Sequence, residues 1–152
     1  SKYYELTTPL KALGNIAFII APYGLISADY EFIDYSNASF YKTPSWVNED
    51  IQNGYTSTHN FRVGTEWRYD VFSFRAGYAY YASPYKNGIN DGCLKAYSGG
   101  LGMKFNEYFI DLAYVFSTWK EDYYLYSYGP YESKADNVYR SHRFLFTIGA
   151  KF

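Results

Sequence analysis

The residue types that most often carry chemistry in proteins are sparse in this sequence. The two histidines, His59 and His142, lie far apart and lack the spacing of metal ligands. The single cysteine, Cys93, follows turn-forming residues and is predicted to be a free thiol in a loop. No Ser, His and Asp stand in a context typical of a catalytic triad, and no glycine-rich phosphate loop is present. We therefore expect no enzymatic activity, no cofactor and no metal site.

The charged residues offer a different kind of chemistry, because many of them fall at alternate positions of strand-like segments. In a β-strand such residues share one face. A shared charged face is typical of a polar pore lining or a docking surface for a plug. The simpler interpretation, which we favour for individual residues, is a ladder of cross-strand ion pairs. The predicted lumen-lining set is Asp29, Glu31, Arg62, Glu66, Arg68, Arg75, Lys104, Asp111 and Arg143.

The elements that position these residues are predicted from period-two alternation, since helical periodicity is scarce. Seven long strands are predicted, and a shorter eighth strand, Lys2 to Thr8, is separated from the first of them by Pro9. A short helix is expected from Trp46 to Gln52, with Ser45 as its cap. The seven long strands are predicted at 10–21, 24–35, 58–69, 71–82, 95–106, 107–119 and 138–152.

The two faces of these strands differ in kind. Aromatic residues make up 24% of the chain, with 21 Tyr and 12 Phe, yet the mean hydropathy is only -0.36. In segment 58–69 one face is largely aromatic, while the other holds glycine and charge. An aromatic face opposite a polar one is typical of a transmembrane β-barrel wall. A soluble lipid-binding barrel, the alternative, would point its aromatic side chains inward.

Other membrane and nucleic-acid classes are disfavoured. The longest apolar run, Ile16 to Ala21, is far shorter than the roughly 20 residues of a membrane helix. A net charge of -1 and a pI near 6.1, without a basic stripe, make nucleic acid an unexpected partner. The opening Ser1-Lys2-Tyr3-Tyr4 does not resemble a signal peptide. We expect that such a peptide was removed or that the chain begins within a larger protein.

The connections alternate between short and long. Short ones fall at Pro22-Tyr23, Asp70 and Asn106-Glu107. Long loops are predicted at 36–57, 83–94 and 120–137. Outer-membrane barrels have short periplasmic turns and longer extracellular loops, so the long connections are expected on one outer rim.

The end of the chain carries an expected assembly signal. Apolar residues at every second position precede a terminal phenylalanine, which is typical of outer-membrane proteins recognised by the barrel-assembly machinery. The residues concerned are Phe144, Phe146, Ile148 and Phe152. Together with the loop pattern, they predict a multi-pass protein of the bacterial outer membrane.

Several short motifs, taken in order, resemble the C-terminal half of the FadL/TodX family of outer-membrane transporters for long-chain fatty acids and other hydrophobic compounds. They run through almost the whole chain. They are Thr8-Pro9, Asp29-Tyr30-Glu31, Gly64-Thr65-Glu66-Trp67-Arg68, Arg75-Ala76-Gly77-Tyr78, Ser83-Pro84-Tyr85 and the terminal Phe152. The resemblance implies a 14-stranded barrel whose plug and laterally opening strand lie in a missing N-terminal half. No substrate-binding residue is carried over.

The sequence thus predicts an all-β fold, an antiparallel transmembrane β-barrel of which residues 1–152 supply about 7–8 strands as one C-terminal domain. The expected function is passive, porin-like transport of hydrophobic small molecules. The tyrosine-rich segment 120–137 is expected either to meet ligand or lipopolysaccharide or, as we favour, to pack upon itself. Alternatives are a small eight-stranded structural or adhesive barrel, formed if Lys2 to Thr8 closes it, and a barrel enzyme such as a lipase or protease.

Overall fold

A computed structural model describes residues 5–41, 43–86, 91–128 and 131–151, apart from the side chains of 123–128 and 131–134. Regular structure in these residues is mostly antiparallel β-strand, as predicted. One sheet has the order β2-β3-β5-β6-β7-β8-β9, so each strand pairs with its neighbours along the chain. The strands are β2 Leu10–Ile20, β3 Gly24–Asp34, β5 Ser57–Tyr69, β6 Phe72–Tyr81, β7 Leu94–Phe105, β8 Tyr108–Tyr128 and β9 Tyr131–Ala150.

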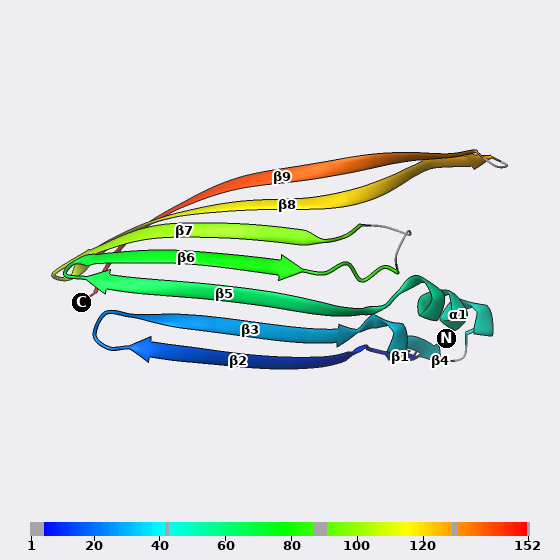
Figure 1. The fold of residues 1–152 in the computed structure, drawn as a ribbon, viewed down its shortest axis with the longest axis horizontal. Coiled ribbons are helices and arrows are strands. Elements are labelled where there is room, and N and C mark those ends of the chain that lie inside the picture. The colour runs from blue at the N-terminus through cyan, green and yellow to red at the C-terminus, as the bar shows by residue number, and fades with distance from the viewer. Residues whose placement is uncertain (1–4, 42, 87–90, 129–130, 152) are drawn as a thin grey trace.

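Tight turns join the strands in pairs at one end of the sheet. Asp70 and Asn106 begin the turns between β5 and β6 and between β7 and β8, with φ of 53° and 52°. Asp and Asn are the non-glycine residues that best tolerate this left-handed conformation. In Figure 1 these turns and the C-terminus lie at one end, and the longer connections lie at the other. The predicted alternation of short and long connections is therefore confirmed for the first two long connections.

The prediction of a third long loop over 120–137 was wrong. Strands β8 and β9 continue through this segment as a paired hairpin that extends beyond the rest of the sheet (Figure 1). Tyrosine favours strands, and pairing satisfies the backbone of both arms even where the side chains are polar. A register shift occurs between Tyr124 and Tyr126. The polar run Lys120-Glu121-Asp122 is paired with Asp136, Asn137 and Val138 in this hairpin.

The N-terminal segment is not an eighth strand of the large sheet. Strand β1 (Glu5–Thr7) pairs instead with β4 (Ser39–Tyr41) in a separate two-stranded sheet. The 3-10 helix η1 (Tyr35–Asn37) and the helix α1 (Ser45–Gly54) complete the connection from β3 to β5. The helix predicted from Trp46 to Gln52 is present, but Ser45 lies within it and Pro44 precedes it without a side-chain cap.

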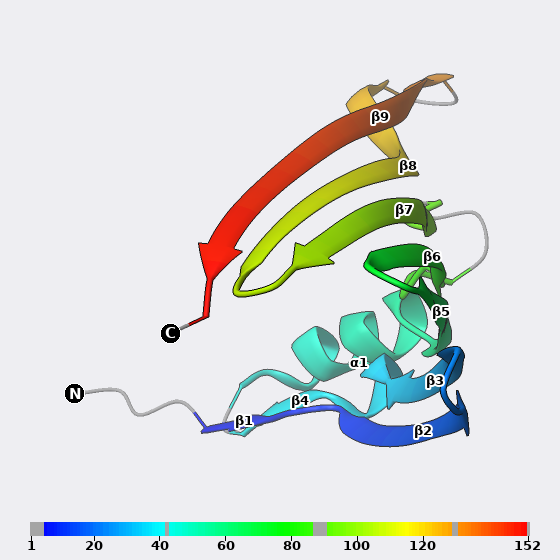
Figure 2. The same cartoon turned by 90° about the vertical axis from the view of Figure 1, so that its left-hand side faces the viewer.

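The large sheet is curved, and α1 lies on its concave side (Figure 2). The most deeply buried side chains share that side, at the end near α1: Glu31, Ile33, Thr58 and Asn60. In the described residues the sheet is open, with β2 and β9 as its two edges and no pairing between them. Barrel closure is therefore not part of the observed fold.

Candidate functional site: the two faces of the curved sheet

All nine charged residues predicted to line a lumen lie on the concave face. Register fixes this placement, because Asp29 pairs with Arg62 and Glu66 pairs with Arg75 across neighbouring strands. Alternation along each strand then places the remaining members on the same side. The structure joins seven of the nine in ion pairs, six with one another and Glu31 with Lys11, while Lys104 and Arg143 form none among the described residues.

The largest group of ion pairs centres on Arg75. Its Nε donates to Glu66 Oε2 at 2.8 Å, and its Nη1 donates to Asp111 Oδ1 at 2.6 Å. Arg68 also donates to Glu66, at 2.7 Å. Two cations and two carboxylates from β5, β6 and β8 thus form one chain that also crosses β7. Charge-assisted bonds of this length are among the stronger hydrogen bonds in proteins.

The Arg75–Asp111 contact is unusual because β6 and β8 are not neighbours. Strand β7 lies between them and presents Gly100 and Gly102 at this point. A Cβ atom added at Gly102 would lie 2.5 Å from Asp111 Oδ1, and one added at Gly100 would lie 3.6 Å from Arg75 Cβ. Because these two glycines have no side chains, the Arg75 guanidinium can cross β7 and reach Asp111. These two glycines therefore permit a contact between strands that are not neighbours.

A second group lies toward α1. Glu31 forms an ion pair with Lys11 and accepts a hydrogen bond from Asn60 Nδ2 at 2.9 Å. The Asn60 Oδ1 accepts from the backbone N–H of Ala82 at 3.0 Å. Asn60 therefore joins β3, β5 and the end of β6. Sequence reasoning missed Lys11 and Asn60, although both follow the alternation of their strands.

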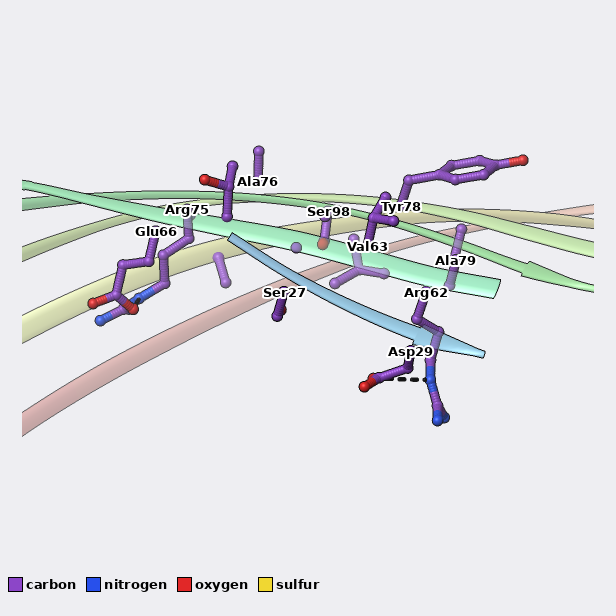
Figure 3. A pocket seen from close by; sticks show the side chains of 18 of the residues that line it. Ser27, Asp29, Arg62, Val63, Glu66, Arg75, Ala76, Tyr78, Ala79 and Ser98 are labelled. Atoms are coloured by element: carbon purple, nitrogen blue, oxygen red, sulfur yellow. Dashed lines mark hydrogen bonds and ion pairs between the residues drawn. The ribbon is translucent and has the colours of Figure 1, made fainter. Parts of the chain in front are cut away.

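Between these groups the concave face contains a hollow of about 610 Å³. Its floor is formed by small residues of neighbouring strands at one level of the register: Ser27, Gly64, Gly77 and Ser98. Figure 3 shows Glu66 and Arg75 projecting together at one end, and Asp29 and Arg62 at the other. The Arg62 Nε lies 3.4 Å from Asp29 Oδ2. The hollow thus has an uncharged floor between two ion pairs.

In the described part of the sheet, the convex face carries no Asp, Glu, Lys or Arg between two groups of aromatic residues, one toward each end of the strands. On β5 it presents His59, Phe61, Val63, Thr65, Trp67 and Tyr69. The one hydroxyl in the middle, Thr65 Oγ1, donates to the Leu25 carbonyl at 3.0 Å. At about 3.3 Å per residue, His59 and Tyr69 are roughly 33 Å apart along the strand. At a tilt of about 40° this distance spans roughly 25 Å, the height of the apolar band of a membrane barrel.

We define two aromatic belts on this face. The outer belt, toward the long connections, consists of Tyr30, Phe61, Tyr80, Tyr97 and Phe116. The inner belt, toward the tight turns, consists of Trp67, Tyr69, Phe72, Phe74, Phe105 and Tyr108. Aliphatic and small residues predominate between the belts.

Both histidines lie at the outer belt and bond to tyrosine. The Tyr30 hydroxyl lies 2.7 Å from His59 Nδ1, and the Tyr114 hydroxyl lies 2.8 Å from His142 Nδ1. Each pair is flanked by phenylalanine rings. These contacts were not foreseen, because each joins residues of different strands. They give the imidazoles a structural partner on an apolar face.

The single cysteine, Cys93, directly precedes β7. Cys93 is a free thiol, with its Sγ 3.6 Å from the Tyr80 hydroxyl. In the described part of the chain, no cluster of three or more His, Cys, Asp or Glu side chains is suited to hold a metal ion. None of the helices in these residues has the length and apolar character needed to cross a lipid bilayer.

The assembly-signal residues that the structure describes lie on the convex face near the inner end of β9. Phe144, Phe146 and Ile148 are 74%, 66% and 65% exposed. Phe152 lies outside the described residues. The alternation that defines the signal is therefore present in the strand, and the role of the signal stays a prediction.

Comparisons with models of known protein families, with curated proteins and with solved structures found no match. The resemblance to the FadL/TodX family therefore rests on the sequence motifs alone.

Proposed function

We propose that this chain forms part of the wall and outer loops of a bacterial outer-membrane β-barrel that passively transports hydrophobic compounds, such as long-chain fatty acids. The observation that carries the proposal is the convex face. Its exposed apolar band has no charge between two aromatic belts, while every predicted lumen charge lies on the opposite face. A lipid-facing wall explains why so much apolar surface lacks a covering layer.

The topology supports a barrel that is larger than these seven strands. In an antiparallel sheet of seven strands the two edges, β2 and β9, run in the same direction. Closure with antiparallel neighbours throughout then requires an odd number of further strands. Seven more strands would give the 14-stranded barrel that the resemblance to the FadL/TodX family implies. An eight-stranded barrel closed by Lys2 to Thr8 has less support, since β1 pairs with β4.

In this proposal the extracellular loops capture a hydrophobic molecule, the barrel interior conducts it, and it leaves sideways through the wall. The hollow on the concave face lies on that interior route. Its floor of glycine and serine lets an apolar molecule lie close to the wall, and the paired charges at each end keep the adjoining surface hydrated. No step requires catalysis.

Membrane location is tested first, in gradient fractions of source-cell membranes blotted with an antibody to this segment. A band in the outer membrane that shifts on boiling, and that is much larger than 17.7 kDa, is expected. A band near 17.7 kDa in that fraction would favour the small structural barrel. A soluble band unaffected by boiling would refute the membrane proposal.

Transport is tested with the full-length protein in cells that lack it, by the uptake of radiolabelled oleate. The substitution Ala96→Trp fills the hollow and is expected to lower uptake. The matched substitution Ala76→Trp adds the same ring to the convex face, where lipid can accommodate it, and should leave uptake unchanged. Equal uptake by both variants and the wild type would count against transport past this hollow.

A further inference from the structure

The convex face is uncharged between its belts, but three cations gather just outside the outer belt. Lys95 on β7 and Arg140 on β9 are both register partners of Thr118, on either side of β8. Lys120 lies two residues further along β8 and therefore on the same face. We call these three residues the outer cation cluster.

The register brings the cluster within reach of one ligand. Neighbouring strands lie about 4.8 Å apart, so the Cα atoms of Lys95 and Arg140 are roughly 10 Å apart. Lys120 is roughly 7 Å along the strand from the line that joins them. Lysine and arginine side chains are long enough to converge over these distances.

The neighbouring charges leave the cluster positive on the side of the apolar band. Among the described residues, Lys120 Nζ lies 3.8 Å from Asp91 Oδ2, and Lys95 and Arg140 have no carboxylate within 4.0 Å. Asp122 and Asp136, register partners on the same face, lie beyond the cluster on the outer side. Toward the band the next groups are aromatic, with Tyr97, Phe116 and His142 at one level. An anion is therefore best accommodated directly above the belt.

We propose that the outer cation cluster binds the phosphate groups of lipopolysaccharide, the phosphorylated glycolipid of the outer leaflet, and holds its acyl chains against β7, β8 and β9. This inference rests on the proposed membrane location. Aromatic belts mark the level where hydrocarbon meets headgroups, so the cluster lies at the height of lipid phosphates. Below it, Leu101, Leu112 and Phe146 form one exposed apolar row that suits acyl chains. A soluble phosphate ligand would leave this row uncovered.

The full-length protein, purified in detergent and placed in phosphatidylcholine vesicles, is titrated with lipopolysaccharide. Lys95→Gln, Lys120→Gln and Arg140→Gln are compared singly and together. A basic residue near a membrane surface contributes about fivefold to the binding of anionic lipid, so the triple variant should bind roughly a hundredfold more weakly. The control Lys151→Gln removes one cation at the opposite end of the sheet and should bind as the wild type does.

Dephosphorylated lipopolysaccharide should bind wild type as weakly as the intact lipid binds the triple variant. Wild-type affinity in the triple variant, or equal affinity for both lipids, would overturn the inference. Heat-modifiable migration reports membrane folding separately. If the wild type does not show heat-modifiable migration, the proposed function is refuted. If the wild type and the triple variant both fold and bind lipopolysaccharide equally well, only this inference is refuted. Should the triple variant not fold, the three single variants decide, and unchanged affinity in all of them overturns the inference.

Discussion

Arginine scanning at alanine positions tests whether the convex face contacts lipid. Ala76 lies in the middle of β6 on that face, four residues from both Phe72 and Tyr80. At about 3.3 Å per residue and a tilt of about 40°, it lies roughly 10 Å from either belt measured along the membrane normal, near mid-membrane. An arginine there costs about 2–4 kcal/mol in a membrane barrel, so Ala76→Arg should lower the folding equilibrium constant roughly 30- to 700-fold.

Two matched substitutions make this test specific. Ala12→Arg also lies on the convex face but just outside the outer belt, opposite Phe32, where the cost should fall to about 0–1 kcal/mol. Ala96→Arg lies on the concave face and should also cost little, because water reaches that side. All three variants exchange the same side chains, so differences among them report only the surroundings.

The assay is equilibrium unfolding by guanidinium of the full-length protein in phospholipid vesicles, followed by tryptophan fluorescence. A convex face covered by protein would make Ala12→Arg about as costly as Ala76→Arg. A convex face in water would make neither costly. Either result would refute the assignment of this face to lipid, and a large cost at Ala96 would refute the assignment of the concave face to water.

Three further predictions use the same unfolding assay. Gly102→Ala places a Cβ atom 2.5 Å from Asp111 Oδ1 and should destabilise the protein by about 1–3 kcal/mol. The control Gly99→Ala, with no atom within 4 Å of the new Cβ, should be nearly neutral. Equal effects would contradict the role of Gly102 in leaving space for the Arg75–Asp111 contact. Asn106→Val should cost about 1–2 kcal/mol because φ at this turn is 52°, and Asn106→Gly should restore stability; an unaffected valine variant would show that the turn can relax. Asn60→Ala leaves a buried carboxylate and a backbone N–H without their amide partner and should cost about 1–3 kcal/mol; a neutral result would mean that water replaces the amide.

The alternation that predicted the strands is a local property of the sequence, so it is present unchanged in the folded structure. Side chains two residues apart share a face, whichever strand is the partner. The sequence therefore predicted that Arg62, Glu66 and Arg68 lie on the face opposite Phe61 and Trp67. The tight turns were equally legible, because Asp and Asn between two alternating segments tolerate the left-handed backbone such turns need.

The contacts between strands required the tertiary structure. Nothing near Arg75 in the sequence indicates that its guanidinium reaches Asp111, since that contact depends on register and on two glycines of the strand between them. The Tyr30–His59 and Tyr114–His142 pairs likewise depend on which residues pairing brings together. Pairing also turned the polar segment 120–137 into a hairpin and assigned β1 to a separate sheet.

The sequence by itself determined which side chains share a face and where the chain turns, because both follow from the geometry of single strands. The tertiary structure decided which charges neutralise each other, which face is concave and where α1 covers it. These properties depend on register and curvature, which arise only when strands far apart in the sequence are hydrogen-bonded side by side.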